Sequence, residues 1–252
     1  MAQHVVNGIT ITYDPQVLQE IIENLAFPML AFDFEAYHFR KDYQLYDHLQ
    51  DSHSKPFLIG TSVLNSLDDL QTKPLDELIN YQYHLNWTIN NKKQHSLKSF
   101  VHFLNRLVLR KKIKTFLVLG KDLEMTILNY MAKKQMFRFN LQNIKIIDIY
   151  DLYHNQNILR FTHPTGEVIT VKQPDYVLQN DELYQILLKN DNHDKDYWDK
   201  LWRTLDALYT YDHKHLNHNL HIFQKTHLSE ILQKNHDDLV KMVNLLKILV
   251  TF

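Results

Sequence analysis

Two acidic residues stand two positions apart inside a strongly apolar stretch of the chain. Asp33 and Glu35 lie in LAFPMLAFDFEAYHF, residues 25–39, whose other members are mostly typical of a buried strand. Side chains two positions apart on a strand point to the same side, so these two carboxylates should project together. Two like charges buried side by side are unfavourable unless a positive charge neutralises them.

A divalent cation would supply that positive charge. Mg²⁺ and Mn²⁺ prefer oxygen ligands and often use only a few carboxylates together with the phosphates of a substrate. We therefore expect Asp33 and Glu35 to bind a metal ion at the end of a central strand. The alternative is that both carboxylates lie just beyond the buried part of the strand and are solvated.

A third acidic residue follows a second apolar strand. In FLVLGKDLE, residues 116–124, Asp122 comes directly after the strand and stands at the start of a helix. Acidic side chains favour the first turn of a helix, which is one explanation for Asp122. The other explanation is that carboxylates at the ends of adjacent strands converge, as a metal site for phosphoryl transfer requires.

The elements that must position these acids follow from hydrophobic periodicity. A hairpin turning at Asn7-Gly8 and a helix beginning at Pro15 come first. The expected strands are Met29–Phe34, Pro56–Leu64, Glu77–Leu85, Thr115–Leu119 and Asn143–Ile149. Helices are expected at Ser96–Arg110, from Lys121 onward and at His236–Val250. An antiparallel meander followed by alternating helices and strands predicts an α/β protein with a mixed sheet flanked by helices.

The composition limits the kind of protein and of metal site. The chain has 252 residues, of which 44% are hydrophobic, and its net charge of −1 means that any site for a polyanion must be a local patch. Because the chain has no cysteine, a metal must be bound by oxygen or imidazole. The first residues do not resemble a secretory signal, and no apolar run reaches the ~20 residues needed to span a bilayer. We therefore expect a cytoplasmic protein without a membrane partner.

We expect one domain over residues 1–252. Residues 1–25 would form an N-terminal extension made of the hairpin and the first helix. Residues 155–224 would form an insert before the C-terminal helix, because the chain between Asp122 and His236 is longer than a minimal fold needs. Such an insert would bind substrate or mediate dimerisation, and the sequence does not fix the oligomeric state.

The motifs around these acids resemble a known family. Phe32-Asp33-Phe34-Glu35 is similar to the first motif of the DEDD 3′–5′ exonucleases, in the branch of the bacterial proofreading subunits and ribonuclease T. LVLGKDLEMTIL resembles the second motif of that family, NIKIIDIYDLY the strand that comes next, and KNHDDLVKMVNLLKIL the closing helix. The resemblance covers most of the chain in order, with few identical residues.

The resemblance implies an RNase H-like fold and a set of site residues. By it, Asp33, Glu35 and Asp122 would be metal ligands, and His236 would be the general base of the H-x-x-x-x-D motif. A histidine suits that role because its ordinary pKa lies near neutrality.

The chain departs from the family at the last motif. Lys241 stands five residues after His236, where the family has its final acidic ligand. Asp237 and Asp238 lie one turn earlier and would complete the metal site on the same helix. Alternatively, Lys241 replaces the charge of one cation and leaves a site that is inactive or holds a single metal. A further alternative is that the two aspartates only favour the first turn of the helix.

The expected function is hydrolysis of phosphodiester bonds from the 3′ end of single-stranded DNA or RNA, by a water activated on Mg²⁺ or Mn²⁺. One alternative is an inactive nucleic-acid-binding or interaction module of the same fold. Another is a different phosphoesterase with an acidic metal site. An acidic cluster completed by Asp237 or Asp238 would favour the exonuclease, and a cluster without a fourth acid would favour the inactive module.

Overall fold

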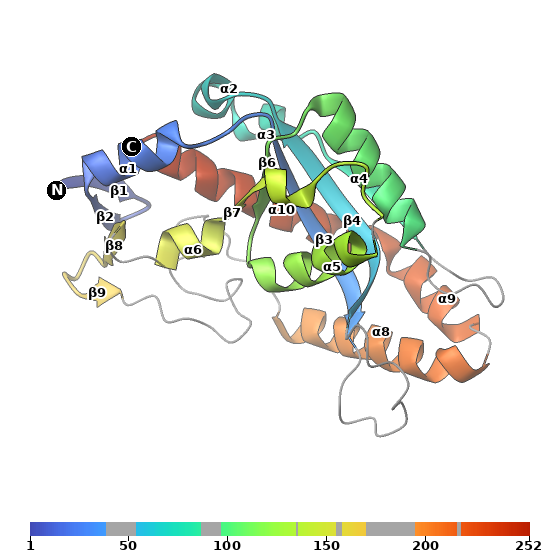
Figure 1. Ribbon diagram of the computed structural model, residues 1–252. Coiled ribbons are helices and arrows are strands. Elements are labelled where there is room, and N and C mark those ends of the chain that lie inside the picture. Colours follow the sequence, from blue (N-terminus) through green and yellow to red (C-terminus); the bar gives the residue numbers. More distant parts are fainter. Residues whose placement is uncertain (39–53, 87–96, 135, 155–157, 170–194, 216–217) are drawn as a thin grey trace.

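The structure is a computed structural model that describes residues 1–38, 54–86, 97–134, 136–154, 158–169, 195–215 and 218–252 (Figure 1). It is an α/β protein with a mixed five-stranded sheet in the order β5-β4-β3-β6-β7 and a four-stranded sheet in the order β1-β2-β8-β9. The strands of the larger sheet are β3 (Met29–His38), β4 (Ser54–Leu64), β5 (Gln82–Leu85), β6 (Thr115–Val118) and β7 (Lys145–Asp148). The strands of the smaller sheet are β1 (Ala2–Val6), β2 (Ile9–Tyr13), β8 (Leu159–Thr162) and β9 (Val168–Ile169).

The helices alternate with these strands along the chain. The longer ones are α1 (Pro15–Glu23), α4 (Lys98–Lys111), α5 (Lys121–Lys133), α8 (Lys195–His215), α9 (His218–Thr226) and α10 (Leu228–Val250). The shorter ones are α2 (Leu67–Thr72), α3 (Leu75–Leu78), α6 (Ile149–His154) and the 3₁₀ turn η1 (Leu141–Asn143). None of the described helices is both long enough and apolar enough to cross a membrane.

Strand β3 is the centre of the larger sheet. It pairs antiparallel with β4 along its whole length, whereas its parallel pairing with β6 covers only Met29 to Ala31. Asp33 and Glu35 therefore lie beyond the residues that pair with β6. At this place the start of α5, which follows β6, can approach the strand.

The two faces of β3 meet different helices. Leu30, Phe32 and Phe34 pack with α4 and α5 in one buried cluster. Ala31, on the opposite face, packs in a second cluster with residues of α10, which crosses behind the larger sheet in Figure 1. Because side chains alternate along a strand, Asp33 and Glu35 share the face of Ala31 and project toward α10.

The smaller sheet joins two parts of the sequence that were predicted as separate. The predicted hairpin is present, and Asn7 and Gly8 both have the positive φ that its tight turn requires. Its second strand pairs with β8, which belongs to the predicted insert. Within that insert, residues 170–194 lie outside the described part of the chain, and α8 and α9 lie further along.

Three predicted elements differ from those observed by more than two residues. Strand β3 was predicted to end at Phe34 but continues to His38, so Asp33 and Glu35 lie within the strand and not at its end. The segment Glu77–Leu85 does not form one strand, because its start belongs to α3 and only Gln82–Leu85 pairs with β4. The last helix begins at Leu228 rather than at His236. The polar residues at its start conceal the helical pattern, because Lys234 and Asn235 are buried although neither is apolar.

Candidate metal centre

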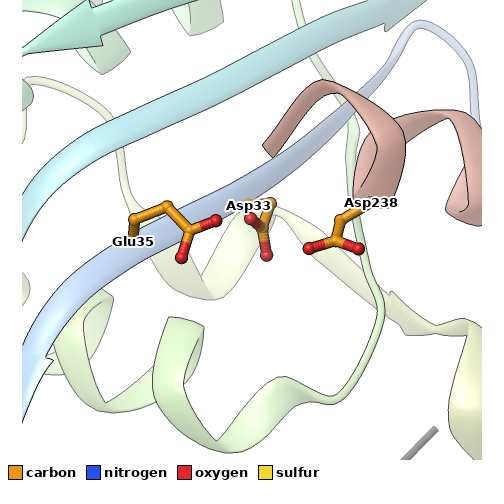
Figure 2. A group of neighbouring side chains, drawn as sticks. All are labelled: Asp33, Glu35 and Asp238. Atoms are coloured by element: carbon orange, nitrogen blue, oxygen red, sulfur yellow. The ribbon is translucent and has the colours of Figure 1, made fainter. Parts of the chain in front are cut away.

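Three carboxylates from β3 and α10 meet beside the centre of the larger sheet. One oxygen from each of Asp33, Glu35 and Asp238 lies within 4.8 Å of the other two, and Asp33 stands between its neighbours in Figure 2. Glu35 and Asp238 are buried, with 8% and 5% of their surfaces exposed, and Asp33 is partly buried. The residue types and the crowding are those of a site for a hard cation.

A fourth carboxylate, Glu124, approaches this group from α5. It is buried on the same side of the helix as Ile127, Leu128 and Met131. Its charge raises the pKa of Asp33, which shows that the two groups are electrostatically close. Glu124 was missed in the sequence, although its spacing of three, four and seven residues from these apolar neighbours indicates an inward position.

Asp122, the ligand predicted from the second motif, does not belong to the acidic group. Its side chain is exposed in the first turn of α5, and its backbone carbonyl accepts a hydrogen bond from Thr126 Oγ1. Near the start of a helix, an acidic residue has a favourable position without any metal. The helix turns Glu124, and not Asp122, toward β3.

Of the two aspartates predicted on the last helix, only Asp238 reaches the carboxylates of β3. Asp237 accepts a hydrogen bond from Gln233 Nε2 at 2.8 Å, between two partly or fully exposed positions. Both aspartates lie well inside α10, so the alternative that they favour its first turn is wrong. The choice between them depends on the rotation of α10 against the sheet, which buries Asp238 and leaves Asp237 partly exposed.

His236 is also separate from the acidic group. Its ring stands edge-on against Tyr81, with the ring centres 5.1 Å apart, and its Nδ1 lies 3.5 Å from Asp237 Oδ1. If Asp238 is the final acid, the H-x-x-x-x-D spacing falls on Gln233, which is exposed. The structure therefore places the base predicted at His236 beside Tyr81 and Asp237, and not in the group of Asp33, Glu35 and Asp238.

Two buried lysines hold Asp238. Lys234 Nζ lies 2.6 Å from Asp238 Oδ2 and 3.9 Å from Glu35 Oε1, and Lys241 Nζ lies 3.0 Å from Asp238 Oδ1. These residues occupy positions 234, 238 and 241 on one side of α10, at the helical spacing of four and then three. Lys241 thus neutralises Asp238, which lies three residues earlier on the same helix.

The pKa values separate Asp238 from the other acids. Burial raises the pKa of Glu35 to about 7 and that of Glu124 to about 8, and burial together with the charge of Glu35 raises the pKa of Asp33 well above its ordinary value. Burial alone would also raise the pKa of Asp238, but Lys234 and Lys241 hold it below its ordinary value. Asp238 is therefore ionised at neutral pH, whereas burial makes ionisation of Asp33, Glu35 and Glu124 more costly than in water, and a bound cation would offset that cost.

Asn235 connects α10 to Asp33. Its Nδ2 donates to Asp33 Oδ2 at 2.7 Å, and its Oδ1 accepts from the Tyr81 hydroxyl at 3.1 Å. Gly60, opposite Asp33 on β4, makes this approach possible, because a Cβ atom there would lie 1.8 Å from Asn235 Oδ1. The glycine is required by the close packing and not by its backbone angles.

Asp148 fixes the start of the helix that carries Glu124. Its carboxylate accepts hydrogen bonds from the backbone N–H groups of Gly120, Lys121 and Tyr150, at 2.9, 3.0 and 2.9 Å. Lys121 also pairs with Asp151 on α6. Asp148, at the end of β7, therefore holds the start of α5 next to the start of α6.

The residues present fit a hard divalent cation. Among the described residues, Glu35 Oε1 and Glu124 Oε2 are buried oxygens without a hydrogen-bond partner, which is costly unless another group binds them. All the acidic donors are oxygens, the donor type that Mg²⁺ and Mn²⁺ prefer. Of the three carboxylates that lie within 4.8 Å of one another, Asp238 already accepts hydrogen bonds from two lysines on both its oxygens. Asp33 and Glu35 would therefore hold such an ion, with Glu124, whose charge acts on Asp33, as the nearest further acid.

A scan against models of known protein families finds no match for this chain, and a search of curated proteins finds none either. The site is therefore interpreted from its own geometry and chemistry.

Proposed function

We propose that the protein hydrolyses phosphodiester bonds from the 3′ end of single-stranded DNA or RNA, with Mg²⁺ or Mn²⁺ as the cofactor. The observation that carries this proposal is the group of Asp33, Glu35 and Asp238, together with two buried oxygens, Glu35 Oε1 and Glu124 Oε2, that accept no hydrogen bond. A bound divalent cation would activate water and neutralise charge on the phosphate. A cytoplasmic location is part of the same proposal.

The sheet supports the RNase H-like core on which this proposal relies. An antiparallel meander of β3, β4 and β5 lies on one side of the central strand, and the parallel strands β6 and β7 lie on the other. The acids that carry the proposal come from β3, from the helix after β6 and from the closing helix. This agrees with the order of motifs in the resemblance, with Glu124 in place of Asp122 and with Asp238, one of the two predicted aspartates, in place of the acid that Lys241 replaces.

The protein's own residues have distinct roles in this proposal. Asp33, Glu35 and Glu124 bind the cation, and Asn235 orients Asp33 through its hydrogen bond. Asp238 holds Lys234 beside Glu35. His236 has no assigned step, because its ring lies against Tyr81.

An inactive module of the same fold is the second candidate function. The observation that favours it is the ion pairing of Asp238 with both Lys234 and Lys241, which occupies the last acid with ammonium groups. In that case the acidic group would be a remnant, and the protein would bind nucleic acid or another partner without cleaving it.

Incubation of the pure protein with 5′-labelled single-stranded DNA and RNA separates the two candidates. Wild type should shorten the substrate stepwise in Mn²⁺ or Mg²⁺ but not in EDTA, and a 3′-phosphate block should slow it. Asp33→Asn should abolish the ladder, whereas Asp122→Asn, which alters an exposed acid, should retain it. If wild type cleaves neither substrate, the nuclease proposal fails and the inactive module is favoured.

A further inference from the structure

Lys234 occupies a place where a metal ion shared by two acids would be expected. Its ammonium group lies 2.6 Å from Asp238 Oδ2 and 3.9 Å from Glu35 Oε1, so it lies near carboxylates of both α10 and β3. Only 8% of its surface is exposed. An ammonium group that is buried and ion-paired in this way is costly to displace, because its partners would then be buried charges without compensation.

A contact with an aromatic ring of another helix also keeps Lys234 in this place. The ring of Trp202, from α8, lies 5.9 Å from Lys234 Nζ, within the range of a cation–π interaction. Although burial favours the neutral amine, the ion pairs with Asp238 and Glu35 favour the charged ammonium group. The lysine is therefore a fixed positive charge of the folded protein.

The charges of the site leave room for one divalent cation. The group of Asp33, Glu35 and Asp238, together with the nearby Glu124, carries four negative charges when all the acids are ionised. The two ammonium groups of Lys234 and Lys241 neutralise two of them, which leaves two negative charges. Both oxygens of Asp238 already accept hydrogen bonds from the lysines. The buried oxygens that accept no hydrogen bond, Glu35 Oε1 and Glu124 Oε2, lie on the other acids.

We infer that this centre binds one divalent cation, and that the ammonium group of Lys234 permanently replaces a second one. The cation binds through Asp33, Glu35 and Glu124, while Asp238 serves to hold the lysine. The inference rests on the cation site of the proposed function and is independent of whether cleavage follows.

Titration of the full chain with Mn²⁺ tests this inference directly, with calorimetry for the number of ions and paramagnetic resonance for their coupling. Wild type should bind one ion per chain with the spectrum of isolated Mn²⁺. Lys234→Met, which keeps the length but removes the charge, should bind two ions with a spin-coupled spectrum. Its first ion should bind at least about tenfold tighter, because a neighbouring positive charge is gone.

Lys225→Met is the matched control, since it removes an exposed lysine of α9 and should leave one ion with unchanged affinity. Two ions in the wild type, no bound ion in the wild type, or a single ion in folded Lys234→Met would each overturn the inference. If Lys234→Met does not fold, the wild-type stoichiometry and spectrum decide the question. A wild type that holds one ion but cleaves no labelled substrate contradicts the nuclease proposal and leaves this inference standing.

Discussion

At the scale of single residues, the start of α5 carries two acids with opposite surroundings. Glu124→Gln should weaken Mn²⁺ binding at least about tenfold, because it removes a charged oxygen from a buried site. The fold should tolerate the change, since burial raises the pKa of Glu124 to about 8 and the side chain is already mostly neutral at pH 7 without metal. Calorimetric titration of the two proteins measures the difference.

Asp122→Asn is the matched control for that prediction. It removes one negative charge two positions away, from a side chain that is exposed. Its Mn²⁺ affinity should stay within about twofold of wild type, because a solvated charge interacts weakly with a buried site. The opposite ranking, with Asp122 essential and Glu124 dispensable, would restore the ligand expected from the second motif.

The sequence predicted the single residues of the site only in part. The spacing of Asp33 and Glu35 was sufficient to place them on one face of a strand. Asp122 was predicted as a ligand from its place between strand and helix and from the resemblance to the second motif, and Glu124 was missed although helical periodicity turns it inward. The ion pairs of Lys234 with Asp238 and Glu35 could not be predicted in full, because they depend on how α10 sits against β3.

At the scale of elements, the contact between α10 and β4 determines whether Asp33 keeps its partner. Gly60→Ala would place a Cβ atom 1.8 Å from Asn235 Oδ1 and 2.9 Å from the ring of Tyr81. Helix α10 must then move away from the sheet, so the free energy of unfolding should fall by about 3 kcal/mol. Chemical denaturation of the variant and the wild type gives this quantity.

Truncation of Asn235 tests whether its clash with the new Cβ atom at position 60, and not a change in backbone freedom, causes the loss of stability. In the background of Asn235→Ala, Gly60→Ala should cost less than about 1 kcal/mol, because residues in contact have non-additive effects. The ring of Tyr81 accounts for the remaining cost. Equal costs in both backgrounds would mean that Asn235 does not pack against Gly60 as described.

The order of the elements was easier to predict than their ends. The apolar runs of β3, β4 and β6 are long enough to indicate strands, and their order predicts the mixed sheet. The start of α10 was placed eight residues too late, because its first turns carry Lys234 and Asn235 in buried positions. That error also left Asp237 and Asp238 indistinguishable, since the rotation of a helix is known only when its register against the sheet is known.

Part of the predicted insert belongs to the surroundings of the site. Leu201 and Leu205 of α8 pack against Tyr37, near the end of β3, and Phe57, near the start of β4. Trp202 of the same helix lies over Lys234. Helix α8 therefore supports the lysine that pairs with Asp238, a role that sequence distance alone does not reveal.

At the scale of the whole molecule, the buried acids make stability depend on pH. Burial raises the pKa of Glu35 to about 7 and that of Glu124 to about 8, so the folded protein retains protons that the unfolded chain loses at lower pH. The folded state then binds more protons, and stability must fall as the pH rises from about 5 to about 8. His84 acts in the opposite direction, because burial lowers its pKa.

Comparison of wild type with Glu35→Gln isolates one acid, since the contribution of His84 is common to both proteins. Without metal, the variant should gain about 2 kcal/mol over wild type between about pH 5.5 and about pH 8, because a glutamine has no proton to lose. Thermal and chemical unfolding at the two pH values measure this gain. A stability difference that does not change with pH would mean that Glu35 is ionised at no cost in the metal-free protein.

Mn²⁺ should offset the stability that wild type loses relative to Glu35→Gln at the higher pH. A cation that binds only the folded state stabilises it in proportion to its affinity and its concentration, and it replaces the protons on the acids that hold it. Wild type should therefore gain more stability from Mn²⁺ at about pH 8 than at about pH 5.5, and Glu35→Gln should gain little at either. If Mn²⁺ stabilises both proteins equally, it binds away from Glu35, and the buried oxygens of the acidic group are not its ligands.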